Sequence, residues 1–142
     1  MTNRMKVEFD SISANEAFAR VTAAAFLAQL NPSVEEVADV KTAVSEAVTN
    51  AIIHGYQGEV HTITIEGELE GDLLTLRVRD EGVGIADIGQ AMEPLYTSRP
   101  ELERSGMGFL FMEAFMDEVL VESEPGKGTC VTLRKRIGRG KD

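Results

Sequence analysis

The sequence predicts an α+β fold: a two-layer sandwich in which helices cover one face of a mixed, mostly antiparallel sheet. The predicted strands come in adjacent pairs, and the helical patterns are grouped between them. The clearest strand has Leu74, Leu76 and Val78 on one face and two arginines on the other. One buried and one solvated face is typical of an antiparallel sheet that is covered on one side. The 142 residues are predicted to form a single domain.

The first part of the chain predicts one strand and two helices. Residues 6–9 alternate as a short strand does, and residues 15–30 repeat with helical spacing. Ser33 and Glu36 form a capping box at the start of a second helix, and Gly55 is predicted to end it at the C′ position. The stripe expected to be buried on the first helix consists of Phe18, Val21, Thr22, Ala25, Phe26 and Leu30.

The remaining elements are two strand pairs that flank a long irregular segment and a short helix. The strands are predicted at 60–69, 73–80, 119–121 and 129–133, and the helix at 109–116. Between 81 and 108 the periodicity fails, and the segment contains five glycines and two prolines. A loop of this length inside a compact domain is usually functional or disordered.

Composition limits the classes of function. A formal charge of −10 argues against direct nucleic-acid binding and favours protein partners. The single cysteine excludes an intrachain disulfide, and no apolar run is long enough to span a membrane. The N-terminus does not read as a signal peptide, so a cytoplasmic location is expected. Five basic residues near the end predict a basic tail at about 134–142.

Glu46 and Asn50 are the first pair of residues that could carry chemistry. They lie one turn apart on the second helix and project from the same face, away from its apolar stripe. A carboxylate can accept a proton, and an amide oxygen can bind a hard cation such as Mg²⁺. Taken alone, the pair is more simply explained as part of a solvated helix face.

Two glycine-containing corners follow strands or join them. Asp80 ends a strand and is followed by Gly82 and Gly84, which permit a tight turn and the close approach of a ligand. Its carboxylate could accept a hydrogen bond from an exocyclic amine such as that of adenine. Gly128 lies in a hairpin turn, from which the hydroxyl of Thr129 could reach a ligand. Ordinary turns are the alternative interpretation of both corners.

A third corner begins the short helix. Gly106 and Gly108 would leave backbone N–H groups free at a helix N-terminus, where a phosphate can bind. Arg104 and Arg99 could supply positive charge beside them. A flexible hinge is the alternative. The corner is not a P-loop, because the required Gly-Lys-Ser/Thr sequence is absent, and no βαβ unit frames it.

In this order, the helix pair and the three corners resemble the nucleotide-binding fold of the GHKL superfamily, which includes gyrase-type ATPases, Hsp90 chaperones, MutL and histidine kinases. The resemblance implies a Bergerat-type site for ATP and Mg²⁺. Asn50 would bind Mg²⁺, Asp80 would bind the adenine amine with support from Thr129, and Glu46 would be the general base. The loop at about 86–105 would be the ATP lid. Further nucleotide contacts, with Arg104 as a catalytic cation, would come from Gly82, Gly84, Ser105, Gly106 and Gly108.

The sequences of residues 45–56 and 99–109 are most similar to the anti-sigma F family of spore-forming bacteria. Members of this family are small GHKL serine kinases. This implies a homodimer that sequesters the sporulation sigma F factor and phosphorylates a serine of an anti-anti-sigma partner. Arg20, the only cation on an apolar first helix, is the candidate partner contact, or else only a solubilising residue. Two alternatives remain: a non-catalytic, ATP-dependent sigma-binding module, and a histidine-kinase-like catalytic domain, although the chain has only two histidines.

Overall fold

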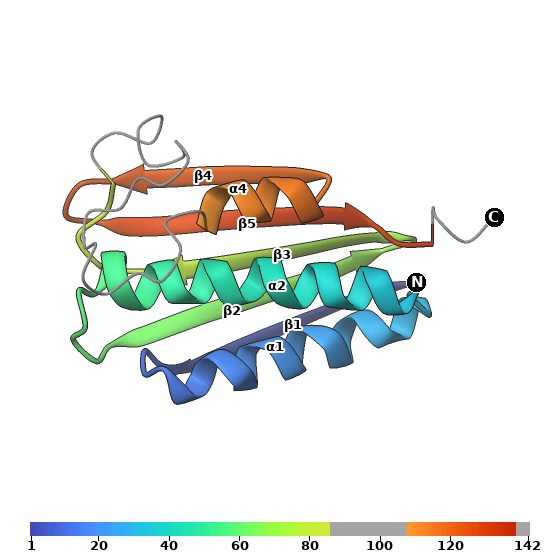
Figure 1. Cartoon of the computed structure of the whole chain (residues 1–142), viewed down its shortest axis with the longest axis horizontal. Helices are drawn as coiled ribbons and strands as arrows, with labels where there is room; N and C mark the ends of the chain where they lie inside the picture. The colour runs from blue at the N-terminus through green and yellow to red at the C-terminus, as the bar shows by residue number, and fades with distance from the viewer. Residues whose placement is uncertain (86–107, 139–142) are drawn as a thin grey trace.

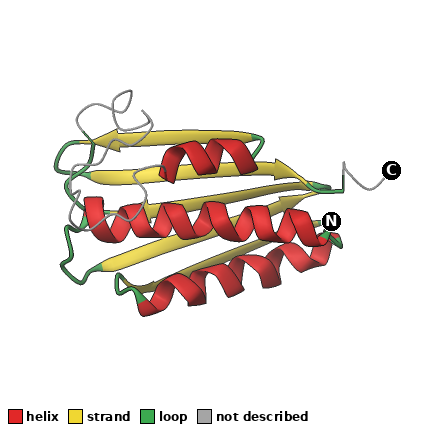
Figure 2. Cartoon of the chain, in the orientation of Figure 1, coloured by secondary structure: helices red, strands yellow, loops and turns green. Residues whose placement is uncertain are grey.

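A computed structural model describes residues 1–85 and 108–138, and these form one five-stranded sheet with three α-helices on one face (Figures 1 and 2). The strand order is β1-β2-β3-β5-β4, and all four strand pairs are antiparallel. The α+β sandwich is confirmed, and no parallel pair occurs among the described strands. The elements are β1 (Thr2–Asp10), α1 (Ala14–Leu27), α2 (Val34–Asn50), β2 (Thr62–Glu70), β3 (Leu73–Asp80), α4 (Gly108–Phe115), β4 (Glu118–Glu124) and β5 (Gly128–Arg136).

The core lies between the sheet and the helices because the strand registers bring apolar residues into rows. Val78 pairs with Ile65 on one side and with Val131 on the other, and all three are almost fully buried. The opposite face of the sheet carries charge: Arg79 lies 3.2 Å from Glu66 across β2 and β3. The alternation predicted for β3 is therefore confirmed.

The buried face of α1 differs from the predicted stripe. Phe18 and Val21 are 47% and 65% exposed, whereas Glu16 is only 8% exposed. The acid is buried because it accepts a 2.7 Å hydrogen bond from the hydroxyl of Thr49 on α2. This polar pair lies between the two helices, whereas Phe18 and Val21 point outward from α1. The residues that α1 does bury are Glu16, Ala19, Ala23, Phe26 and Leu27.

The start of α2 follows the prediction, but its end does not. Ser33 Oγ accepts from Glu36 N, and the Glu36 side chain accepts from Ser33 N, as in a capping box. At its other end α2 continues into a π-helical turn over Ala51–Gly55, and Tyr56 has right-handed dihedral angles. Gly55 is therefore not a C′ cap. Its missing side chain serves a close approach to β3.

The strands at the end of the chain are longer than predicted. Residues 134–136, expected in a basic tail, belong to β5, where Arg134 pairs with Glu118 and Arg136 pairs with Asp72. Two basic side chains are thus held by acidic residues of the neighbouring strand β4 and of the β2–β3 turn. No helix in the described part of the chain is long and apolar enough to cross a membrane.

Candidate functional site

Four parts of the chain meet at one end of the molecule: the C-terminal end of α2 with its π turn, the end of β3, the start of α4 and the start of β5 (Figure 1). Antiparallel pairing aligns Asp80 at the end of β3 with Thr129 at the start of β5. Residues predicted from separate motifs are therefore brought to the same end of the sheet.

Glu46 and Asn50 face the beginning of α4. A Cβ on Gly108 would lie 3.1 Å from Glu46 Oε2 and 3.2 Å from Asn50 Nδ2. The glycine therefore allows the first turn of α4 to pack directly on the two polar side chains. Both residues are partly buried, and the contact places the predicted base and the predicted Mg²⁺ ligand beside a helix N-terminus.

The amide of Asn50 suits a nucleotide with its cation. Its Nδ2 atom is buried and has no hydrogen-bond partner among the described residues, which is unusual because buried polar groups are normally paired. An unpaired N–H donor fits a phosphate oxygen, and the Oδ1 of the same amide is the kind of oxygen that Mg²⁺ prefers. The described residues contain no cluster of three or more potential metal-binding side chains. Mg²⁺ needs none, because it commonly binds one or two protein groups together with phosphates and water.

Asp80 is a buried acid at the end of β3. It is 6% exposed, and a Cβ on Gly55 would lie only 2.7 Å from its Oδ1 atom. Burial raises the pKa of Asp80 from 3.8 to about 6, while hydrogen bonds from the backbones of Gly82 and Thr129 act in the opposite direction. A carboxylate held in this way is a strong acceptor with a fixed direction, as recognition of an amine requires.

Gly82 and Gly84 lie against protein backbone. A Cβ on Gly82 would lie 2.0 Å from Gly55 O, and one on Gly84 would lie 2.2 Å from Glu124 O. Val83 N also donates to Gly55 O at 2.9 Å. The two glycines are therefore required by the close approach of three chain segments, and their predicted contact with a ligand stays a prediction.

Thr129 has a partner that the sequence did not indicate. Its hydroxyl lies 2.8 Å from Ser123 Oγ, which also accepts a 2.7 Å hydrogen bond from Ile85 N. Ser123 thus ties the segment after β3 to the β4–β5 hairpin. The alternation of residues 118–124 places Ser123 on the helix-facing side, and this was the available signal.

Arg20 lies beside the same half of α2, on the side of α1. It donates to Ser45 Oγ at 3.2 Å, so it joins α1 to α2 immediately before Glu46. A surface hollow of about 350 Å³ lies here and is lined by Arg20, Ala38, Lys41, Thr42, Ser45 and Glu46. The hollow gives access to the side of Glu46 from solvent.

Some predicted site residues lie outside the described residues. These are Arg104, Ser105 and Gly106, together with the predicted lid at about 86–105.

Comparison with known proteins supports a nucleotide site. Residues 11–135 match the family model of the histidine kinase-like ATPase domain. Curated anti-sigma F factors match nearly the full chain: that of Thermoanaerobacter sp. strain X514 is 58% identical over 99% of this chain and 98% of its own. The one from Clostridium beijerinckii is 60% identical over 95% of each chain.

A solved structure shares the fold. The crystal structure of the RsbU and RsbW domains of a Mycobacterium tuberculosis protein aligns with a TM-score of 0.67 and 23% identity, over 95% of this chain and 32% of the other. Together with the motif order and the site geometry, these matches show that the chain belongs to the histidine kinase-like ATPase family and, within it, to the anti-sigma F factors.

Proposed function

We propose that this protein is an ATP- and Mg²⁺-dependent protein serine kinase that also sequesters a sigma factor. The observation that carries the proposal is the packing of Gly108 on Glu46 and Asn50, where Asn50 Nδ2 is buried without a hydrogen-bond partner in residues 1–85 and 108–138. The names of its relatives support the sigma-binding role. The phosphorylated partner is an anti-anti-sigma factor, as the resemblance to the family implies.

The residues would take the roles that the resemblance to the family implies. Asp80 would accept a hydrogen bond from the adenine amine, and Thr129 would support that end of the site. Asn50 would hold the cation through Oδ1, and the N–H groups at the start of α4 would bind phosphate oxygens. When bound, Mg-ATP supplies the phosphoryl group and the positive charge that balances it.

Glu46 is the proposed general base. Its carboxylate lies against the start of α4 and lines the hollow that opens to solvent. A seryl hydroxyl entering from the hollow would reach Glu46 beside the start of α4, and Glu46 would take its proton during transfer. Arg20 and Lys41 line the same hollow, so the entering segment would meet two cations. Arg20 is the proposed partner contact.

The substitution Glu46→Gln tests the enzymatic part. It keeps the shape of the side chain and removes its basicity, so phosphoryl transfer should fall by about 10²–10⁴-fold. The affinity for Mg-ATP should change little. Transfer to the serine partner is measured by mass spectrometry, and nucleotide binding by titration calorimetry. Wild-type-like transfer in this variant would remove Glu46 from the mechanism. Nucleotide binding without any transfer by the wild type would favour the non-catalytic sigma-binding module.

The substitution Arg20→Glu tests the partner surface. It should weaken capture of both protein partners, because the charge at the hollow reverses, and leave nucleotide binding intact. Lys127→Glu, which reverses a charge on an exposed hairpin side chain, is the matched control. Equal partner affinities in the two variants would return Arg20 to a solubilising role.

The outward face of α1 supports a homodimer. Phe18 and Val21 are 47% and 65% exposed there, and Ile12, just before α1, is 42% exposed. The Phe18 ring packs edge-on against Phe9 of the edge strand β1. A second copy of the chain would cover this apolar surface.

A further inference from the structure

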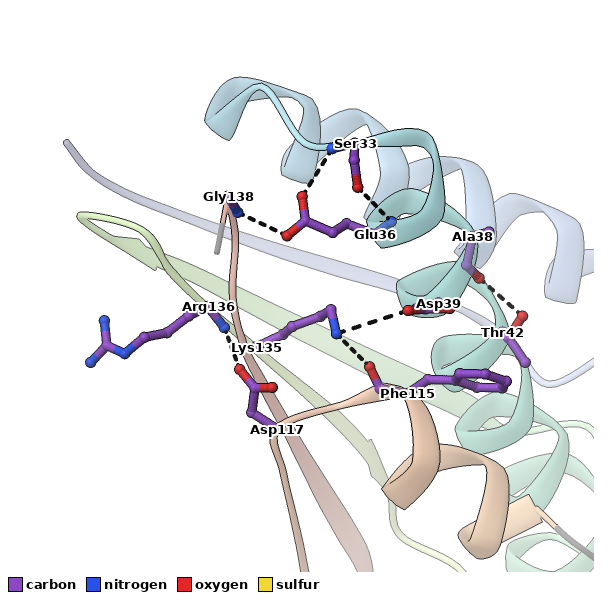
Figure 3. Close-up of polar contacts among 10 residues, drawn as sticks. All are labelled: Ser33, Glu36, Ala38, Asp39, Thr42, Phe115, Asp117, Lys135, Arg136 and Gly138. Atoms are coloured by element: carbon purple, nitrogen blue, oxygen red, sulfur yellow. Dashed lines mark hydrogen bonds and ion pairs between the residues drawn. The ribbon is translucent and has the colours of Figure 1, made fainter. Parts of the chain in front are cut away.

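Lys135 lies at the end of the molecule away from the candidate site. It belongs to β5, and its side chain turns to the helix-covered face (Figure 3). Its Nζ atom donates a 2.8 Å hydrogen bond to Phe115 O, at the last residue of α4. The same atom lies 3.9 Å from Asp39 Oδ2 of α2, and the two side chains are only 14% and 23% exposed.

This contact holds the C-terminal end of α4. The last carbonyl groups of a helix lack partners within the helix, and a cation there is favoured by the helix dipole. Lys135 supplies both the donor and the charge, and Asp39 compensates the charge from α2. Asp117, two residues further along the chain, is held as well. Its N–H donates to Arg134 O, and its Oδ2 accepts from Arg136 N (Figure 3).

The other end of α4 is the start of the candidate site. The helix has eight residues, so it is about 12 Å long, and it packs along α2 with Met112 fully buried between its ends. Asp39 and Glu46 are seven residues apart, which is about two turns on the same side of α2. One helix thus contacts α2 through Lys135 at one end and through Gly108 at the other.

We propose that Lys135 is a positioning residue of the nucleotide site, acting through α4. A short rigid helix transmits a shift of one end to the other, so loss of the Lys135 contact would move the N–H group of Gly108 relative to Asn50. The proposal rests on the proposed function, because it concerns the same nucleotide. No other part of that proposal assigns a role to Lys135.

The test compares Lys135→Met with Arg136→Met. Both variants lose one positive charge at neighbouring positions, but the Arg136 side chain faces away from α4 and pairs with Asp72 in an exposed ion pair. We expect Lys135→Met to raise the Kd of Mg-ATP about tenfold, and Arg136→Met to leave it within about twofold. Lys135→Arg should restore most of the affinity, because arginine can donate to Phe115 O.

Two further measurements separate positioning from loss of stability. Titrations are made well below the Tm of every variant, and amide hydrogen exchange of α4 is followed without nucleotide. We expect faster exchange in α4 of Lys135→Met, and unchanged exchange in β2. Asp39→Asn should reproduce part of the effect, and should add little to Lys135→Met.

Each outcome decides one question. Equal Kd values in the Lys135→Met and Arg136→Met proteins, with nucleotide still bound, would overturn the role of Lys135 and leave the proposed function standing. A wild type that binds no Mg-ATP would overturn both. Faster exchange throughout the sheet in Lys135→Met would reduce Lys135 to a contributor to global stability.

Discussion

Burial of the Asp80 carboxyl group favours its protonated form more than the unfolded chain does. Burial raises its pKa from 3.8 to about 6, so the folded protein binds this proton more tightly than the unfolded chain does. The resulting contribution to stability is fully present below pH 3.8 and is lost as the pH rises through about 6. The buried, ionised Asp80 that would accept from an amine therefore lowers the stability of the ligand-free protein at neutral pH.

Asp80→Asn should show this cost. At pH 7.5 the ligand-free variant should be freed of the cost of ionising Asp80, up to about 3 kcal/mol for about two pKa units at about 1.4 kcal/mol each. The cost of placing the amide NH2 group beside the donors Gly82 and Thr129 reduces this gain equally at every pH. The gain should shrink at pH 5, and nucleotide affinity should fall, because the amide must now accept from both Gly82 and the adenine amine. Urea unfolding at the two pH values, with the exposed Asp10→Asn as control, measures the difference. An equal gain at both pH values would contradict the assignment.

The turn after β3 requires glycine because neighbouring backbone leaves no space for a side chain, as well as for its backbone conformation. Gly82 occupies a place where the nearest neighbour of a side chain would be the backbone oxygen of Gly55. A side chain at Gly82 would push the backbone of Gly55 away, and this would separate the end of β3 from the end of α2. Gly71, in the β2–β3 turn, has a φ of +61° but open space around it, so its requirement is conformational only.

These two glycines should respond differently to alanine. Gly82→Ala should destabilise the protein by about 3 kcal/mol, at the upper end of overpacking costs, and should also impair nucleotide binding. Gly71→Ala should cost about 1 kcal/mol, the price of a left-handed residue, and leave binding unchanged. Urea unfolding and nucleotide titration of both variants make the comparison. Similar results for the two would show that the close approach at Gly82 relaxes easily.

The molecule as a whole carries its polar and apolar surfaces on different elements. The open face of the sheet bears paired charges such as Arg79 with Glu66, whereas the outward side of α1 is apolar beside the edge strand β1. Large apolar patches of this kind mark interaction sites in folded proteins. The hollow at Arg20 lies between α1 and α2, so a dimer through α1 would place this hollow near the second copy.

Val21→Asp should convert the proposed dimer to a monomer, because it buries a charge in the apolar interface. Val34→Asp is the matched control: Val34 is 88% exposed at the start of α2, away from this face. Sedimentation velocity at several concentrations gives the oligomeric state. A wild type that remains monomeric at high concentration would contradict the dimer directly.

The sequence by itself determined the elements and the family. Three patterns depend on residues only a few positions apart: the alternation in β3, the stripe of α2 and the capping box of Ser33 and Glu36. Such patterns can be recognised in the sequence because the interactions that cause them are local. The order of the acid–amide pair and the glycine corners was sufficient to indicate a GHKL fold, because each corner requires a particular backbone or donor.

Only the tertiary structure decided which partners these residues meet. The rotation of α1 follows from the bond of Glu16 to Thr49, 33 positions away. Likewise Lys135, expected in a tail, is held by Asp39 and Phe115 from two different helices. The physical reason is that such contacts join segments distant in the chain, so their energies depend on how helices and sheet pack and leave no periodic trace in the sequence.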